Sequence, residues 1–542
     1  MERRKRICWV VGIALLLVFM LASCTLGSGN NPSGGDPNGP GGGNVEEPWM
    51  DNTPIGPDKL VTYASSDLNA GYITGDTTQT PNSLGNYSEV TAVAKIGYKF
   101  VKWSDGRTTP SRCDTKSLKL AKITAVFEHE ILDMPIIKID TSTGTDVTTR
   151  SEYIYADMEV VETDGTVTYE TDRLQIRGRG NSTWSLPKKS YRMKLPSKQN
   201  LLDVGKGKEK DWILLACHCD HTLQRVGLAF QLANMLTGID HVPGSRPVEV
   251  YLNGEYRGVY LLTEQTEVAE SRVNIDDSDP DNNPSLDFLF EMTAWEFDYG
   301  FTVRGRKIGI KSDLPTSEEK RNAEIERADA ALTAAYDALY EGNKEKIEAL
   351  VDLNSLIDTY LLHEITKNFD TGFDSFYMYY ITGDKLYFGS PWDYDLALGN
   401  ANLGSEFYYG LQAAITPIFF DPNLAWVDTS NPWFYNVMEH EWFREMVVAR
   451  WDEMKETIET LPSYVTANTE QYINSYNRNF EKWPIFGQAF VRTTGIILKF
   501  DSYEQHTFYL SYWTAARIAW LDECFHSEDF ASGKIVGRLE EK

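Results

Sequence analysis

The chain has 542 residues, of which 42% are hydrophobic and 12% aromatic, enough to bury the cores of one large domain and one smaller domain. Its 52 basic and 79 acidic residues give a formal net charge of −27. Nucleic-acid binding is therefore disfavoured, because no excess of positive charge is available to replace phosphate counterions. Acidity of this kind is otherwise typical of a soluble surface.

The N-terminus has the parts of a bacterial export signal. Residues 3–6 are all basic, and residues 7–21 form an apolar run that is short for a transmembrane helix. The following Leu21-Ala22-Ser23-Cys24 resembles the bacterial lipobox. The resemblance implies a signal peptide over 1–24, lipidation of Cys24 and a membrane-anchored lipoprotein of the bacterial cell envelope, outside the cytoplasm. An uncleaved anchor is the alternative, and it fits the small residues before the cysteine less well.

Two further segments precede the large domain. Residues 25–58 are rich in Gly, Asn and Pro, which predicts a flexible linker that buries no core. Residues 59–130 predict a compact β module with strands at 60–64, 88–94, 98–103 and 123–127. Gly97-Tyr98, Phe100, Trp103 and Asp105-Gly106 in this module resemble the divergent InlB B-repeat of bacterial surface proteins. The resemblance implies a small β-grasp-like fold that serves as a spacer, with adhesion as the alternative.

The remaining residues, 134–542, predict one α+β domain. Strands and hairpins dominate up to residue 310, and Ala, Glu, Lys and Leu at three-to-four spacing predict helices over 316–367. From residue 431 the pattern is helical again, most clearly over 442–461 and 508–525. The domain therefore combines a mainly antiparallel sheet region with a helical C-terminal part.

An apolar strand ending near residue 176 leads into a loop of alternating arginine and glycine. Glycines let the backbone approach an anion, and Arg177 and Arg179 supply forked donors for phosphate oxygens. A plain turn is the alternative for this loop. In the next strand, alternation places Lys189 on the apolar face of Tyr191 and Met193, and Lys188 on the solvated face. A lysine on an apolar face needs a carboxylate or phosphate partner, unless its ammonium extends to solvent from the strand end.

Residues 247–264 form the clearest hairpin, because Asn253-Gly254 is typical of a type I′ turn. Glu264 ends the second strand on the face of Tyr260 and Leu262, where its carboxylate is available to a buried cation. We hypothesise that Lys189 and Glu264 pair, like the lysine–glutamate pair that positions nucleotide phosphates in protein kinases.

The cluster Cys217-His218-Cys219-Asp220-His221 suggests a metal site. Structural zinc sites, however, use wider ligand spacing and a second distant pair of ligands. The stronger interpretation is a strand end with small buried thiols.

The segment 368–400 places four acidic residues at the outer ends of a predicted hairpin. Two precede the strand 375–381 and two follow the strand 385–388: Asp370 and Asp374, then Asp393 and Asp395. The Gly383-Asp384 turn folds the strands antiparallel, so these ends meet. Four carboxylates at one edge repel each other unless a cation lies among them, and a divalent metal with phosphate is the simplest explanation. The segment therefore indicates phosphoryl-transfer chemistry.

Several motifs, taken in order, resemble the CotH-type (spore coat protein H) kinase family: Arg177-Gly-Arg-Gly-Asn-Ser182, Lys188-Lys-Ser-Tyr-Arg192, Asp211-Trp212 with Asp220 and Arg225, Asn253–Glu264, and Ser390–Gly399. The resemblance covers roughly 136–450, and Pro391-Trp392-Asp393-x-Asp395 is its most specific motif. It implies an atypical protein-kinase-like fold that uses ATP and a divalent metal to phosphorylate Ser/Thr side chains of proteins.

The resemblance also implies roles for individual residues. Asp370 would orient or deprotonate the acceptor hydroxyl, with Asp374 as a rival. Asp393 would be catalytic as a metal ligand, with Asp395 assisting it. The nucleotide would be bound by a set drawn from three segments: Arg177, Arg179, Asn181, Ser182, Lys188, Lys189 and Glu264.

These expectations combine into one functional prediction. The chain is expected to be an exported, lipid-anchored protein serine/threonine kinase that uses ATP with Mg²⁺ or Mn²⁺ and acts on a protein acceptor. The alternative is a non-catalytic surface-binding or adhesion lipoprotein whose acidic site binds a structural cation. A metal hydrolase is disfavoured because no histidine lies among the carboxylates.

Overall fold

The computed structural model describes residues 53–95, 97–130, 132–372, 374–400, 431–490 and 496–533. The predicted signal peptide, Cys24 and nearly all of the predicted linker lie outside these residues. The chain divides into two compact units, Met1–His129 and Glu130–Lys542. Each unit is described by itself below.

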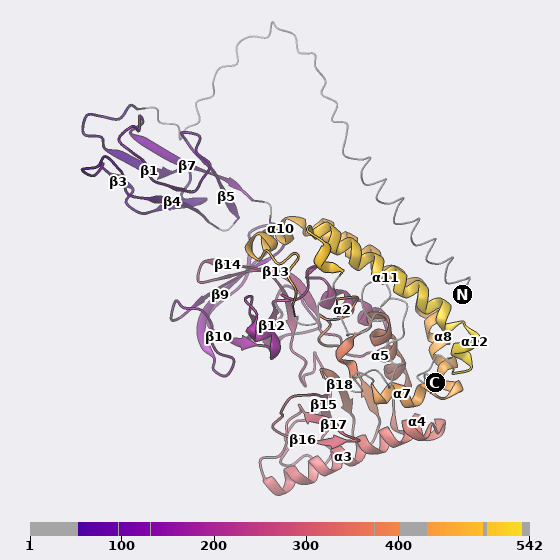
Figure 1. Cartoon of the computed structure of the whole chain (residues 1–542). Helices are drawn as coiled ribbons and strands as arrows, with labels where there is room; N and C mark the ends of the chain where they lie inside the picture. The colour runs from indigo at the N-terminus through magenta and orange to yellow at the C-terminus, as the bar shows by residue number, and fades with distance from the viewer. Residues whose placement is uncertain are drawn as a thin grey trace. The chain divides into compact units, whose positions relative to one another are not determined.

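The N-terminal unit is all β (Figure 1). Its sheets have the strand orders β3-β1-β7-β5 and β2-β4-β6. The strands are β1 (Val61–Ser65), β2 (Gly71–Thr74), β3 (Thr78–Gln79), β4 (Val90–Ala94), β5 (Tyr98–Trp103), β6 (Ser111–Arg112) and β7 (Lys122–His129). β1, β4, β5 and β7 confirm the four predicted strands, whereas the other three are too short to show an alternation. The fully buried Trp103 is the centre of the core and meets the ring of Tyr63 edge-on at 6.0 Å.

The C-terminal unit begins with a closed barrel of strand order β10-β11-β12-β14-β13-β8-β9. Its strands are β8 (Ile136–Thr141), β9 (Ile154–Val161), β10 (Val167–Arg179), β11 (Ser190–Gln199), β12 (Glu209–Leu215), β13 (Ser245–Leu252) and β14 (Glu255–Glu264). The turn between β13 and β14 is the predicted one, with φ of 52° at Asn253 and 74° at Gly254. Barrel closure was not predicted, because the parallel pairing of β8 with β13 joins segments more than 100 residues apart.

A second sheet follows, with strand order β16-β17-β15-β18-β19. Its strands are β15 (Phe288–Met292), β16 (Gly300–Val303), β17 (Arg306–Ile310), β18 (Phe376–Tyr380) and β19 (Leu386–Phe388). β18 and β19 are the predicted acidic hairpin, paired antiparallel with Tyr380 opposite Leu386. The acidic residues on both sides of this hairpin are therefore anchored to the sheet.

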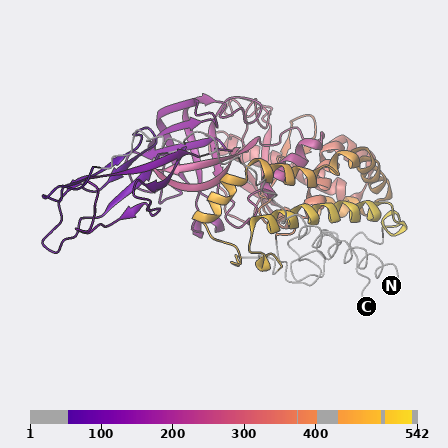
Figure 2. The ribbon, with the colours of Figure 1, turned by 90° about the horizontal axis from the view of Figure 1, so that it is seen from above.

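The other regular elements described in this unit are helices, and all but α2 lie in the segments that the sequence predicts to be helical. They are α2 (Arg225–Met235), α3 (Glu318–Glu341), α4 (Lys344–Leu350), α5 (Leu353–Thr366), α7 (Pro432–Met438), α8 (Glu441–Ile458), α9 (Leu461–Gln471), α10 (Ile473–Lys482), α11 (Tyr503–Phe525) and α12 (Glu528–Ala531), with short 3₁₀ turns η1 (Ser182–Ser185), η2 (Phe369–Gly372) and η4 (Ile497–Lys499). In Figure 1, α3 runs along the sheet of β15–β17. The C-terminal helices, coloured orange to yellow, lie beside one another in Figure 2. Among them, α11 contacts α8, α9 and α12, and it also contacts α5.

Helix α5 positions the start of the acidic segment. The Asp352 side chain caps it by accepting a hydrogen bond from Ser355 N at 2.7 Å, and Lys367 ends it with a φ of 48°. Every side chain from Ser355 to Thr366 is buried. Helix α5 is therefore part of the core, and it holds the following turn η2, which contains Asp370, in a defined position. Among the described residues, no helix is both long enough and apolar enough to cross a membrane.

Candidate active site

A pocket of about 870 Å³ lies between the barrel and the second sheet, within the C-terminal unit. Its lining comes from the end of β10 with η1, the start of β11, the turn after β12, the region of β15 and the acidic segment. All four acidic residues singled out from the sequence line it: Asp370, Asp374, Asp393 and Asp395. Residues 177–182 and Lys188 line it as well, apart from Gly178. Most of the predicted site residues are therefore brought together in one cavity.

The barrel side of the pocket carries the arginines. Arg177 and Arg179 alternate along β10 and both line the pocket. Gly178 between them makes room for η1, since a Cβ there would lie 2.1 Å from the Trp184 ring. The Arg177 side chain donates to the Arg150 carbonyl and lies 5.0 Å from the centre of the Tyr153 ring. Arg177 is thereby tied to the barrel.

Arg179 is held differently. Its guanidinium lies 4.8 Å from the centre of the Trp392 ring, next to Asp393 in sequence. Among the described residues, no side chain forms a hydrogen bond or ion pair with this guanidinium. Burial lowers the pKa of Arg179, and nearby Tyr377, Asp393 and Glu291 offset part of that effect. Its donors therefore remain available to an anion in the pocket.

The two lysines exchange the roles that strand alternation predicted. Lys188 is 2% exposed and lines the pocket, whereas Lys189 is half-buried outside it and donates to the Trp184 carbonyl at 2.6 Å. The prediction is wrong because β11 begins only at Ser190, after a turn at Pro187, so its alternation does not extend back to the lysines. Burial lowers the pKa of Lys188 to about 7.

The predicted pair of Lys189 with Glu264 is also wrong. Glu264 on β14 lies opposite Trp212 on the neighbouring strand β12, and Trp212 lies opposite Met193 on β11. Met193 is four residues beyond Lys189, or roughly 13 Å along the strand. Glu264 lies outside the pocket lining, and its carboxylate accepts from Gly244 N at 2.8 Å. Glu264 therefore stabilises the end of strand β14, outside the pocket.

The opposite side of the pocket is acidic and strained. Asp393 has a φ of 64°, an uncommon conformation for a residue other than glycine, and accepts from the Ser375 hydroxyl at 3.3 Å. Burial raises the pKa of Asp393, and the charge of nearby Arg179 lowers it. Burial also raises the pKa of Asp395 well above its usual range, and the charges of Asp393 and Asp370 raise it further. A positive charge in this part of the pocket would offset the electrostatic repulsion between these carboxylates.

The chemistry of this donor set fits a hard divalent cation such as Mg²⁺ or Mn²⁺. The available ligands are carboxylate oxygens, and Asp393 and Asp395 are the residues that would hold the ion. Within the described ranges, no three His, Cys, Asp or Glu side chains form a group that could hold a metal by itself. Phosphate oxygens and water would complete the shell, which is the usual arrangement for Mg²⁺.

The structure separates the two candidates for the acceptor-side carboxylate. Asp374 accepts from Thr293 Oγ1 at 2.9 Å, Ala294 N at 3.2 Å and Trp295 Nε1 at 2.8 Å. Its role is to fix the loop after β15. Asp370 is half-buried in η2, where Asn368 Oδ1 accepts from its backbone N–H at 3.1 Å. The three bonds that hold Asp374 to this loop therefore make it the less suitable of the two for contact with a substrate.

The turn with Cys217 and Cys219 forms part of the pocket wall. Both thiols are free and half-buried. Burial and the nearby carboxylates raise the pKa of Cys219 to about 12 and that of Cys217 further, so both stay protonated. Buried Asp220 accepts hydrogen bonds from Thr222 and Arg225 and fixes the turn. These features favour small buried thiols over a zinc site.

Some lining residues were not predicted. Glu291 pairs with Lys311 at 2.6 Å, and Trp295 is 48% exposed at the rim. The signal for Glu291 was present, since it is the one acidic residue in the apolar strand Phe288–Met292. The pairing with Lys311 depends on the sheet and could not be seen in the sequence.

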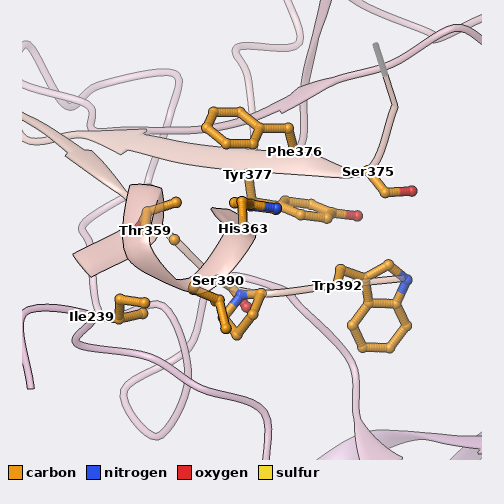
Figure 3. Close-up of a pocket in the computed structure, with 11 residues that line it drawn as sticks. Ile239, Thr359, His363, Ser375, Phe376, Tyr377, Ser390 and Trp392 are labelled. Carbon is orange, nitrogen blue, oxygen red and sulfur yellow. The ribbon is translucent and has the colours of Figure 1, made fainter. Parts of the chain in front are cut away.

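A smaller cavity lies behind the acidic segment, between it and α5 (Figure 3). Thr359 and His363 of α5 face Ser375, Tyr377 and Trp392 across it. Burial lowers the pKa of His363 to about 3, and its ring stacks 5.6 Å from that of Tyr394. A neutral buried histidine thus supports the segment that carries Asp393 and Asp395.

Comparison with known protein families agrees with the two-part organisation. The family described as divergent InlB B-repeat domain matches residues 61–131, and the family described as CotH kinase protein matches residues 176–521. No curated protein matches the chain significantly. The second match covers more than half of the chain and includes every residue that lines the pocket. The chain therefore belongs to the CotH kinase protein family.

Proposed function

We propose that the C-terminal unit transfers the γ-phosphoryl group of ATP to a serine or threonine hydroxyl of a protein, with Mg²⁺ or Mn²⁺. The observation that carries this proposal is the division of charge within one pocket. Arg177, Arg179 and Lys188 enter the pocket from β10 and the start of β11, and Asp370, Asp393 and Asp395 enter it from the acidic segment. Phosphoryl transfer needs both, because phosphate oxygens must be held while an acceptor hydroxyl approaches in line.

The cationic side would bind the nucleotide. Arg179 offers unoccupied donors to phosphate oxygens, with Arg177, Asn181 and Ser182 beside it at the mouth. Leu215, Ala216 and Val226 give the same pocket an apolar wall that suits a purine base. Lys188 takes the lysine position that the sequence had assigned to Lys189.

The acidic side would serve the metal and the acceptor. Asp393 and Asp395 would hold the divalent cation, which when bound neutralises charge on the phosphates. Asp370 would accept the proton of the acceptor hydroxyl as its oxygen attacks the γ-phosphorus. Asp374 would keep the Thr293–Trp295 loop in place at the rim.

A non-catalytic cell-surface protein with a structural cation is the alternative. That function needs only the acidic side and gives no role to Arg179, whose donors are unoccupied among the described residues. We therefore prefer the kinase.

We further propose that the protein is exported and anchored to a cell-envelope membrane through lipidated Cys24, with the β module as a spacer. The support is the lipobox-like sequence at residues 21–24. Replacement of Cys24 by serine is expected to release the protein into the soluble fraction and to abolish incorporation of labelled palmitate. Retention in the membrane with no label in either protein would contradict the proposal.

The kinase proposal is tested with residues 25–542, γ-labelled ATP, Mg²⁺ or Mn²⁺ and a generic serine-rich protein. Asp393→Asn is expected to lose roughly 100-fold or more of the transfer. Asp384→Asn is the matched control, since Asp384 lies in the hairpin turn and accepts from Tyr387 outside the pocket. Equal labelling by wild type and Asp393→Asn would refute the proposal. So would the absence of labelling with either metal together with no nucleotide-dependent rise in Tm.

A further inference from the structure

The Lys188 ammonium is held by a neutral side chain from a distant helix. Its Nζ donates to Asn479 Oδ1 at 3.0 Å and to the Val259 carbonyl, and it lies 4.7 Å from the centre of the Tyr260 ring. An ammonium has three donors, so two protein bonds leave one for a ligand. Among the described residues, no carboxylate pairs with Lys188.

The Asn479 side chain is itself held in place by burial and by a second hydrogen bond. It lies on α10, is 1% exposed, and its Oδ1 also accepts from Val259 N at 3.0 Å. Gly258 has a φ of 99°, and a Cβ there would lie 2.5 Å from Asn479 Oδ1. The strand β14 is thus shaped to let this one oxygen reach both the backbone and Lys188.

We propose that Asn479 is a positioning residue that holds the Lys188 ammonium at the anion-binding side of the pocket without neutralising its charge. This inference rests on the proposed function, because it names the residue that prepares Lys188 for phosphate. A carboxylate at the same place would compensate the lysine charge internally. An amide oxygen leaves that charge to the incoming anion.

Other titratable groups of the described residues also lie next to Lys188. They are the Cys217 thiol and His218 from the turn after β12 and the Tyr260 phenol from β14. Burial raises the pKa of Cys217 and of Tyr260 and lowers that of His218 to about 4, so all three are neutral near pH 7. A change of charge at residue 479 is therefore expected to act on Lys188 directly.

The test measures Lys188 itself. Trace labelling of amines with acetic anhydride across a pH series, with mass spectrometry of the peptide that contains Lys188, gives the pH at which this amine becomes reactive. Asn479→Asp places a carboxylate about 3 Å from the ammonium and is expected to move this midpoint upward by one pH unit or more. The same variant is expected to raise the KM for ATP about tenfold while kcat changes less, because the internal carboxylate competes with phosphate.

The matched control is Trp483→Phe. Trp483 is the C-cap residue of α10 and donates from Nε1 to the Arg257 carbonyl at 2.8 Å. Phenylalanine keeps an aromatic ring beside His218 but loses this bond, so the variant weakens helix docking and leaves the Asn479–Lys188 bond in place. It is expected to lower Tm and leave the labelling midpoint unchanged. An unchanged midpoint in Asn479→Asp, or an equal shift in Trp483→Phe, would overturn the proposal.

The labelling needs no nucleotide and so separates this inference from the proposed function. A shifted midpoint in a protein that transfers no phosphate would refute the kinase and support the Asn479–Lys188 contact. Active wild type with no shift in Asn479→Asp would refute the positioning role alone.

Discussion

The guanidinium of Arg179 lies 4.8 Å from the centre of the Trp392 ring and so links the barrel to the acidic segment. Trp392 is buried and immediately precedes Asp393. The residue best placed to bind phosphate and the residue best placed to bind metal are therefore held by one contact. A ring face orients an arginine without consuming its N–H donors.

Replacement of Arg179 by alanine is expected to weaken nucleotide binding about 10- to 100-fold, because hydrogen bonds to charged groups contribute about 1.5–3 kcal/mol. Calorimetric titration with a non-hydrolysable ATP analogue measures this. Arg173→Ala is the control, since Arg173 is an exposed arginine on the same strand. Equal affinity of the Arg179 and Arg173 variants would exclude Arg179 from the phosphate site.

Replacement of the two lysines by methionine distinguishes their roles. Lys188→Met is expected to raise the KM for ATP at least about tenfold, because one charge-assisted bond to phosphate is lost. Lys189→Met is expected to change it less than about threefold, since the Lys189 ammonium donates to the Trp184 carbonyl and lies over the Trp184 ring, outside the pocket. Steady-state kinetics with both variants decide the matter, and the opposite ranking would restore the assignment from strand alternation.

Asp370→Asn and Asp374→Asn are expected to affect different properties, the first the rate of phosphoryl transfer and the second the stability of the protein. The first removes the proton acceptor and lowers kcat about 100-fold or more, with nucleotide affinity retained. The second leaves the metal ligands intact but weakens the Thr293–Trp295 loop, so Tm falls and kcat changes little. Rapid-quench measurement of the chemical step provides the comparison. A larger loss of kcat in Asp374→Asn would transfer the role of the base to Asp374.

Metal-free protein is expected to become less stable as pH rises, in part through Asp395. Its pKa is raised in the folded state, so the native protein binds the proton more tightly than the unfolded chain. Stability is therefore lost as pH rises from the ordinary carboxyl pKa to the raised one. Asp395→Asn removes this cost and is expected to raise the Tm of the metal-free protein at pH 7.5 by about 2 °C or more.

The same variant is expected to lose the rise in Tm that Mg²⁺ with nucleotide causes in wild type. Differential scanning fluorimetry with and without both ligands tests the two halves together. A lower Tm without ligand, or an undiminished response to metal and nucleotide, would contradict the assignment of Asp395.

The sequence by itself determined the parts of this protein that depend on neighbouring residues. The Asn253-Gly254 turn, the β18–β19 hairpin and strands β1, β4, β5 and β7 of the N-terminal unit follow from alternation and turn chemistry over short distances. The four carboxylates and the two arginines of the pocket could be named for the same reason, because each group flanks a recognisable strand.

Only the tertiary structure decided how those parts work together. Barrel closure through β8 and β13 and the docking of α10 bring Asn479 to Lys188 across 291 residues, and no local pattern contains that contact. Alternation failed at Lys189 because the strand begins one residue later, and barrel register keeps Glu264 away from the pocket. Asp370 and Asp374 are equivalent as acids in sequence. Three donors from the loop after β15 distinguish them, because hydrogen-bond partners are set by packing rather than by residue type.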